Sequence, residues 1–199
     1  MYTIRAYEEK DRQRVEAICL SPEKADTGEA SGNGGIFSSM LRTVFCRYYV
    51  EQEPHNCFVA VNEKDNVVGY ILCAADFQVW EEKFTDLYLK KSRDPITRAV
   101  GKGTIDILRG FHTEYPAHLH IDLAASCQRQ GLGTKLTDTL LKHLEGDGVR
   151  GIMLSVEAKN EKGIRFYKKY GFQELGRSKR EITMGKKLYI SQYYFENPV

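Results

Sequence analysis

The chain has 199 residues, of which 42% are hydrophobic, and its 29 basic and 27 acidic residues leave a formal net charge of +2. This length and composition predict a single globular domain over residues 1–199, with an ordinary packed core. The balanced charge gives no case for a nucleic-acid-binding surface, and no apolar run approaches the roughly 20 residues that a membrane span needs.

The first half of the chain is predicted to form strands and helices that end in a hairpin. Residues 2–7 alternate between apolar and polar side chains and predict a strand, followed by a helix over 8–20. Residues 21–35 contain several glycines and predict a loop, and 36–53 predict a second helix. Two β-rich runs, 57–61 and 67–75, flank the polar residues 62–66, which is typical of a β-hairpin.

The second half alternates between helices and strands. Residues 76–115 are helical in pattern, with Pro95 and Gly101 as predicted division points. The elements predicted after them are a strand at 117–125, an amphipathic helix at 131–148, a strand at 151–157, a helix at 160–172 and a last strand at 180–188. Because one helix joins the strands at 117–125 and 151–157, we expect them to be parallel neighbours.

The cysteines indicate a reducing environment. They are five in number and widely scattered, with no C-x-x-C pair: Cys19, Cys46, Cys57, Cys73 and Cys127. A disulfide framework or a zinc site is therefore not expected. The start of the chain is charged and has no apolar segment typical of a signal peptide, so we expect a cytoplasmic protein with no membrane and no nucleic-acid partner.

A glycine-containing turn lies between the strand at 117–125 and the next helix, in the sequence "QRQGLGT". Such a turn presents several unpaired backbone N–H groups in one direction, and with the helix dipole these groups form an anion site suited to phosphate. Two common phosphate motifs do not fit. Leu136 stands where a dinucleotide-binding fingerprint needs its third glycine, and the lysine that a P-loop needs after Gly133 is replaced by Thr134.

Three motifs in order resemble those of the GCN5-related N-acetyltransferase (GNAT) family. The first is Gln128-x-x-Gly131-x-Gly133, after a strand and before an amphipathic helix; the second is "NEKGIRFYKKYGF", Asn160 to Phe172; the third is the closing strand "ITMGKKL". The resemblance covers residues 116–188 well and the earlier elements only by their order. In one departure, Ala124 to Cys127 fill a place where the family often has acidic, proline and aromatic residues.

This resemblance implies an α/β fold with a mixed central sheet flanked by helices and an additional helical insertion between the third and fourth strands. It also implies acetyl-CoA as co-substrate. The backbone near Leu123 would pair with the pantetheine arm, and the turn would bind the pyrophosphate. The residues implied in cofactor binding are Leu123, Gln128, Arg129, Gln130, Gly131, Leu132, Gly133, Thr134, Asn160 and Tyr167.

Acid and base candidates follow from the same region. Tyr167 would lie beside the thioester sulfur, and a tyrosine hydroxyl is a suitable general acid for a leaving thiolate. His118, His120 and Asp122 alternate along one strand and so share one face. His120 or Asp122 is a candidate general base. The same pattern also fits a structural polar face, or a metal site, although no metal is expected.

Substrate recognition is expected from the segments that the motifs leave out, with residues 116–188 as the cofactor-binding core. Residues 20–56 and 76–115 are predicted to lie on the acceptor side, where Tyr48, Tyr49, Trp80 and Phe84 either line a pocket or belong to the core. The aromatic tail from Tyr189 is predicted to pack on the domain or against a second subunit, which makes a homodimer a candidate assembly.

The sequence therefore predicts an N-acetyltransferase that transfers an acetyl group from acetyl-CoA to a primary amine of a small molecule or protein. The first alternative is a non-catalytic binding module of the same fold, because "YPAHLHIDL" is similar to acetyltransferase-like domains related to those joined to sugar hydrolases. A second alternative is an enzyme that binds a nucleotide phosphate through an irregular loop.

Overall fold

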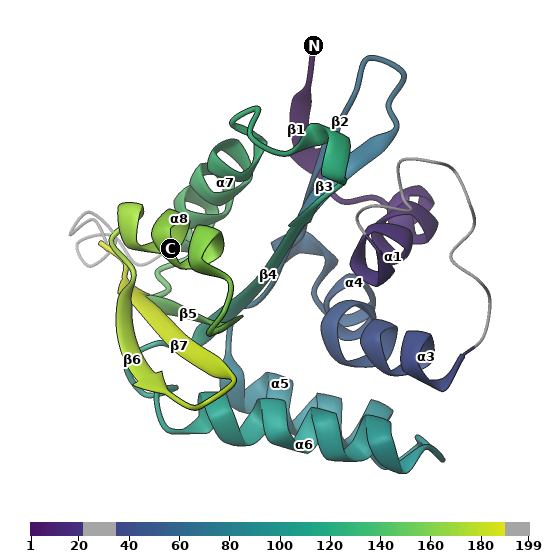
Figure 1. Cartoon of the computed structure of the whole chain (residues 1–199), viewed down its shortest axis with the longest axis vertical. Coiled ribbons are helices and arrows are strands. Elements are labelled where there is room, and N and C mark those ends of the chain that lie inside the picture. The colour runs from purple at the N-terminus through teal and green to yellow at the C-terminus, as the bar shows by residue number, and fades with distance from the viewer. Residues whose placement is uncertain (22–34, 190–199) are drawn as a thin grey trace, which may run out of the picture.

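The computed structural model describes residues 1–21 and 35–189 as a seven-stranded mixed sheet with helices on both faces (Figure 1). The strand order is β1-β2-β3-β4-β5-β7-β6, and β4–β5 is the parallel pair. The strands are β1 (Thr3–Ala6), β2 (Phe58–Val61), β3 (Val67–Ala74), β4 (Ala117–Leu123), β5 (Gly151–Glu157), β6 (Gln173–Arg177) and β7 (Glu181–Lys187).

The helices divide between the two faces of this sheet. They are α1 (Arg12–Leu20), α3 (Ile36–Arg42), α4 (Tyr48–Gln52), α5 (Phe77–Phe84), α6 (Pro95–Arg109), α7 (Leu132–Gly146) and α8 (Glu161–Lys169). Two π-helical turns, η2 (Thr43–Arg47) and η4 (Thr85–Leu89), extend α3 and α5, and 3₁₀ turns lie at η1 (Glu9–Asp11), η3 (Pro54–Asn56) and η5 (Ala125–Cys127). None of the described helices has the length and apolar character needed to cross a membrane.

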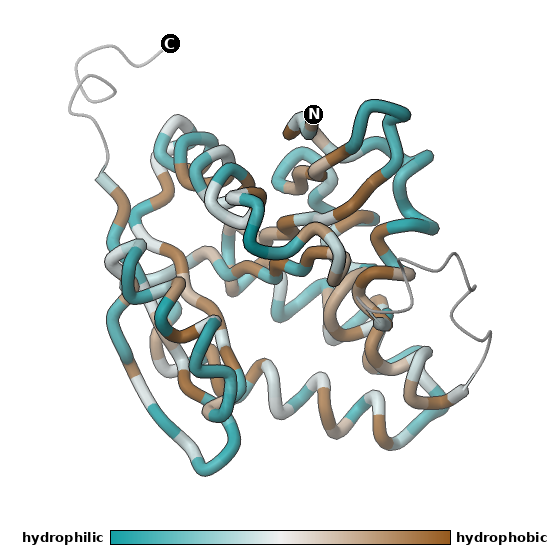
Figure 2. Tube along the Cα trace, turned by 45° about the horizontal axis from the view of Figure 1, so that its top comes forward, coloured by the Kyte–Doolittle hydropathy of each residue, from teal (hydrophilic) through white to brown (hydrophobic). Residues whose placement is uncertain are grey.

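Each face of the sheet has its own hydrophobic core, because alternate residues of a strand point to opposite faces. Tyr70 and Leu72 of β3 pack with α1, α4, α5 and α6, whereas Ile71 and Cys73 pack with α7 and the inner side of α8. Figure 2 shows this pattern, with hydrophobic stretches along the central strands and hydrophilic ones in the outer connections. The two cores fix β4 and β5 between two helical layers.

The predicted order of elements is confirmed with two corrections. Gly101 does not divide the helical region but lies inside α6, where an added Cβ would be 2.5 Å from Leu89, so the glycine permits close packing of α6 on η4. Strand β6 was not predicted, because it is a short edge strand with largely exposed polar residues and no apolar alternation. Most of the loop predicted at 21–35 and of the aromatic tail lies outside the described residues.

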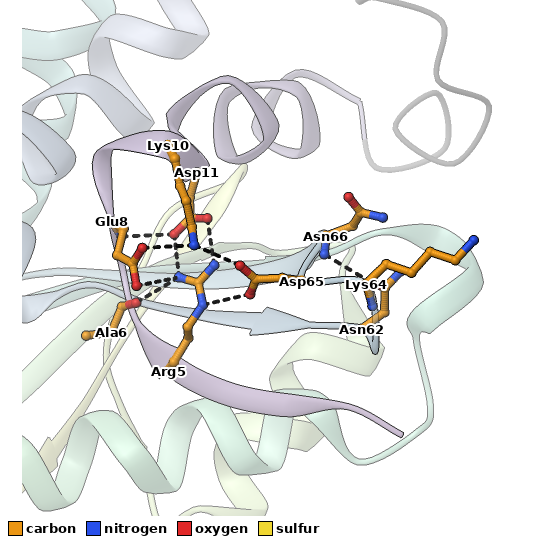
Figure 3. Close-up of polar contacts among 9 residues, drawn as sticks. All are labelled: Arg5, Ala6, Glu8, Lys10, Asp11, Asn62, Lys64, Asp65 and Asn66. Atoms are coloured by element: carbon orange, nitrogen blue, oxygen red, sulfur yellow. Dashed lines mark hydrogen bonds and ion pairs between the residues drawn. The ribbon is translucent and has the colours of Figure 1, made fainter.

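An ion-pair network fastens the start of the chain to the β2–β3 hairpin (Figure 3). Asp11 is buried, and its carboxylate accepts two hydrogen bonds from Arg5, at 2.6 and 2.8 Å. Arg5 also donates to Asp65 at 3.0 Å, in the turn between β2 and β3. Burial opposes ionisation of Asp11, but the bonds from Arg5, the bond from the N–H of Glu8 and the charges of Arg5 and Lys10 together outweigh it, and the pKa of Asp11 is lowered. The network therefore holds β1 and η1 against the hairpin.

We predict that Asp11→Ala destabilises the protein by about 2–4 kcal/mol, because it leaves the partly buried Arg5 without its main partner. Urea unfolding followed by circular dichroism measures this loss. Glu63→Ala is the matched control, since Glu63 pairs with the amino terminus in full exposure and its removal should change the unfolding midpoint little. Equal effects of the two substitutions would contradict the structural role assigned to Asp11.

Candidate active site

The central feature of the site is the divergence of the two parallel strands. β4 pairs with β3 as far as Leu123, and β5 pairs with β7 as far as Glu157. Between β4 and β5, however, the register contains only Ala117–Ile152 and His118–Met153. Beyond His118 the two strands separate, and the edge of β4 that faces β5 has no strand partner among the described residues.

Backbone alternation decides which main-chain groups face this opening. The N–H of Ala124 donates to the carbonyl of Val68 at 2.9 Å and so points toward β3. Successive residues of a strand direct their backbone groups to opposite edges, so the N–H and C=O of Leu119, Ile121 and Leu123 face the opening. An extended ligand could therefore pair with β4 as an additional strand would.

The turn after β4 places unpaired donors at the end of the opening. Arg129 and Gly131 have positive φ values of 60° and 76°, and α7 begins at Leu132. In residues 128–135, all of which the structure describes, the N–H groups of Gly131, Leu132, Gly133 and Thr134 have no recorded acceptor. Together with the positive end of the helix dipole, these groups form a site for an anion such as a phosphate.

Two glutamine side chains of the same turn stabilise it by hydrogen bonds to backbone carbonyls. Gln128 donates through Nε2 to the carbonyl of Leu123 at 3.4 Å, and Gln130 donates to the carbonyl of Ser126 at 2.9 Å. A Cβ added to Gly131 would meet no atom within 4 Å, so the glycine borders open space. The turn therefore leaves its inner surface accessible.

Helix α8 brings Asn160 and Tyr167 to the same region. Asn160 caps this helix, since its Oδ1 accepts from the N–H of Gly163 at 2.9 Å, and an added Cβ on Gly163 would be 2.7 Å from the Asn160 side chain. Gly171, with φ of 83°, ends the helix in the left-handed conformation. The hydroxyl of Tyr170 lies 2.9 Å from the carbonyl of Thr134 and so docks α8 on the start of α7.

The polar face of β4 carries two neutral histidines that share one hydroxyl. The Tyr49 hydroxyl lies 2.9 Å from Nε2 of His118 and 3.0 Å from Nε2 of His120. A hydroxyl donates only one hydrogen bond but can accept two, so at least one of the two imidazoles donates to Tyr49 through Nε2. Burial lowers the pKa of His120 to about 4 and also lowers the pKa of His118 well below its ordinary value, so both rings are uncharged at neutral pH.

Asp122 continues this face toward the turn. Burial raises the pKa of the Asp122 carboxyl to about 6, although the Tyr70 hydroxyl donates to it at 2.7 Å and opposes the rise. Burial, and secondarily the charge of Asp122, raises the pKa of Tyr167 well above its ordinary value. At neutral pH the pair therefore consists of an ionised carboxylate and a protonated phenol, which are suited to act as base and acid.

A cavity of about 190 Å³ lies beside the diverging strands on the histidine-bearing face of β4. Its walls come from β4, β5, α6 and Phe45 of η2, and its lining includes His118, His120 and Glu157. Phe45 and the α6 residues belong to the two segments predicted on the acceptor side, whereas the β4 and β5 residues belong to the predicted cofactor-binding core. Three of the aromatics predicted as possible pocket residues, Tyr48, Trp80 and Phe84, are instead fully buried and pack on one another in the core.

Sequence reasoning missed part of this lining. Phe45, Ser155, Glu157 and Glu181 line the cavity, and none of them was singled out. The sequence shows only that Glu157 ends one predicted strand and that Glu181 lies at the start of the last predicted strand. Their proximity depends on the pairing of β5 with β7, which is a long-range property.

Comparisons with known proteins agree with this geometry. Residues 31–172 match the family model described as "Acetyltransferase (GNAT) family". N-alpha-acetyltransferase 30 of Schizosaccharomyces pombe is 31% identical over 126 residues, which are 63% of this chain and 63% of that protein's length. The match to this relative therefore spans less than two thirds of its length.

Solved structures share the fold over nearly the whole chain. The crystal structure of SsHAT is similar with a TM-score of 0.80 and 28% identity, covering 94% of this chain and 98% of that one. The PaiA N-acetyltransferase of Thermoplasma acidophilum, solved in complex with coenzyme A, has a TM-score of 0.57 at 16% identity and covers 94% of this chain and 99% of that one.

We predict that Tyr70→Phe raises the pKa of Asp122 above 6, by about one unit, because the carboxylate loses the hydrogen bond that stabilises its charged form. A carbon-13 NMR titration of the Asp122 carboxyl measures the change. Tyr48→Phe, which removes a buried hydroxyl bonded to Glu53, should leave this pKa unaltered. An unshifted titration in Tyr70→Phe would show that Tyr70 does not tune Asp122.

Proposed function

The chain belongs to the acetyltransferase (GNAT) family, which confirms the resemblance found in the sequence, and from this membership we propose that it transfers an acetyl group from acetyl-CoA to a primary amine of a small molecule or protein. The observation that carries the proposal is the divergence of β4 and β5 directly before a turn of unpaired N–H donors. This arrangement provides an open strand edge on β4, a cavity beside the start of that edge and an anion site after its end.

The residues present fit acetyl-CoA. The donors at the start of α7 suit a pyrophosphate, Gly131 leaves room for close approach, and the free edge of β4 suits the amide groups of a pantetheine arm. Arg129 adds a positive charge to the turn. We propose that the contacts are made by Leu123, Gln128, Arg129, Gln130, Gly131, Leu132, Gly133, Thr134, Asn160 and Tyr167. Because its Oδ1 caps α8, Asn160 would contribute its Nδ2.

Asp122 is proposed as the base that prepares the amine. An alkyl amine of pKa about 10.4 is neutral in only about 1 of 2,500 molecules at pH 7, which adds about 4.6 kcal/mol to the barrier. The carboxylate of Asp122 is ionised at that pH and attracts the ammonium group. It then accepts the proton directly or through water. His120 and His118 add no positive charge beside it, since both rings are neutral.

Tyr167 is proposed as the acid. When bound, acetyl-CoA supplies the thioester, whose carbonyl carbon forms a bond to the amine nitrogen while its bond to sulfur breaks. The Tyr167 hydroxyl donates its proton to the departing sulfur and is restored from solvent. Burial keeps the Tyr167 phenol protonated, so the proton is available at neutral pH.

The acceptor class remains broad in this proposal. The yeast relative is by name an N-alpha-acetyltransferase, which makes a protein amino terminus one candidate, and the cavity makes a small amine another. Measuring thiol release from acetyl-CoA with a panel of amines distinguishes the acetyltransferase from a non-catalytic binding module. Only the enzyme releases thiol when an amine is added. The cytoplasmic location and the homodimer stay predictions.

We predict that Gly131→Val lowers the affinity for coenzyme A by about 100-fold or more, because its side chain would occupy the space beside the donor turn. Isothermal titration calorimetry measures the affinity, and circular dichroism checks that the variant is folded. Gly146→Ala, at the opposite end of α7, is the control, since its Cβ would meet no atom within 4 Å. Full affinity in Gly131→Val would remove the turn from the binding site.

We predict that Tyr167→Phe lowers kcat by about 100-fold or more while the affinity for acetyl-CoA stays nearly constant, because the proton donor is lost and the ring remains. Steady-state thiol release with an acceptor amine gives kcat, and calorimetry gives the affinity. Tyr115→Phe alters another buried tyrosine, near the start of β4, and should keep wild-type kcat. Unchanged turnover in Tyr167→Phe would exclude the acid role.

A further inference from the structure

Two carboxylates lie opposite each other at the cavity. Glu157 ends β5, Glu181 begins β7, and the two residues are register partners in the antiparallel pair. Like charges directly opposite in a sheet repel each other, so such a pair is normally unfavourable. The Ser155 hydroxyl donates to Glu181 at 2.7 Å and orients it toward its neighbour's side of the sheet.

Neither glutamate forms a direct ion pair with the chain. Lys159, Lys179 and Arg180 border a recess with the two glutamates. Within residues 1–21 and 35–189, however, no basic group lies within 4.0 Å of either carboxylate, the limit for an ion pair. The two carboxylates are therefore free to accept hydrogen bonds from a ligand cation.

A second observation in the same cavity also indicates a ligand. His118 lines the cavity and is only 1% exposed, and its Nδ1 has no hydrogen-bond partner in the part of the chain that the structure describes. Buried polar atoms of this kind normally have a partner, and a ligand or a water that it binds would provide one. The lining of the same cavity includes the apolar side chains Phe45, Ile107 and Leu154.

The register of β4 against β5 relates the two glutamates to Asp122, the proposed base. Counted from the last shared pair, His118–Met153, Asp122 and Glu157 both lie four residues further along the diverging strands. His118, His120, Ser155 and Glu157 all contribute to the cavity, so the side chains of both strands are directed to the same face. By this register, Asp122 and the glutamate pair lie on the two sides of the opening, at equal distances along the chain from its start.

We propose that the cavity selects an acceptor with two cationic groups, an alkyl diamine or a close relative, and that Glu157 and Glu181 hold the ammonium group that does not react. This inference rests on the proposed function and names its substrate class. The apolar walls contact the methylene chain, and the glutamate pair discriminates a diamine from a monoamine of equal length through charge-assisted hydrogen bonds.

The test measures amine binding to the protein saturated with coenzyme A, which cannot react. Calorimetry compares 1,4-diaminobutane with butylamine. It also compares 1,3-diaminopropane with propylamine and 1,5-diaminopentane with pentylamine. We expect the best diamine to bind about tenfold more tightly than its monoamine, and the preference to fall with added salt. In the double variant Glu157→Gln, Glu181→Gln the preference should vanish while monoamine affinity is retained. Glu82→Gln, an exposed acid on α5, is the control.

Equal affinity for diamines and monoamines at every length, or a preference that persists in the folded double variant, would overturn this inference. Thiol release from acetyl-CoA with the same amines reports on the proposed function separately. Turnover without diamine preference contradicts the glutamate subsite alone. Diamine-selective binding without thiol release contradicts acetyl transfer and leaves the subsite standing.

Discussion

The site depends on the loss of backbone pairing between β4 and β5 after His118. Main-chain N–H and C=O groups are costly to leave without partners, so a sheet that opens in its middle must supply them from elsewhere. Here the outer pairs, β3–β4 and β5–β7, continue along the whole length of both strands and hold the opening in shape. The opening is thus bounded by continuous strand pairs, and its free edge on β4 is available to an extended ligand.

The opening also sets the electrostatics of the site. It places His118, His120 and Asp122 against a helical layer with little water, so the uncharged form of each is favoured. Tyr49 and Tyr70 compensate by hydrogen bonds to these residues. The result is a carboxylate of raised pKa beside two uncharged imidazoles. The two imidazoles therefore do not oppose the attraction between Asp122 and the ammonium group of the proposed acceptor.

The local features of the fold and the site were predictable from sequence, and the long-range ones were not. The glycine turn, the Asn160 cap and the parallel strands follow from short-range patterns that the structure repeats. Strand β6 has no such pattern, and the partnership of Glu157 with Glu181 depends on how two distant segments align. The aromatic residues Tyr48, Trp80 and Phe84 show the same difficulty, because periodicity indicates a buried face but does not distinguish a core from a cavity wall.

The shared hydroxyl of Tyr49 makes the two imidazoles of β4 a single unit. If Tyr49 turns its hydrogen toward Nε2 of His118, that ring must carry its own hydrogen on Nδ1, and His120 must then donate to Tyr49 through Nε2. The single hydroxyl hydrogen therefore excludes the combination in which both rings accept, although the ring centres lie 6.4 Å apart. The hydrogen positions of the two rings are thus coupled through one oxygen atom.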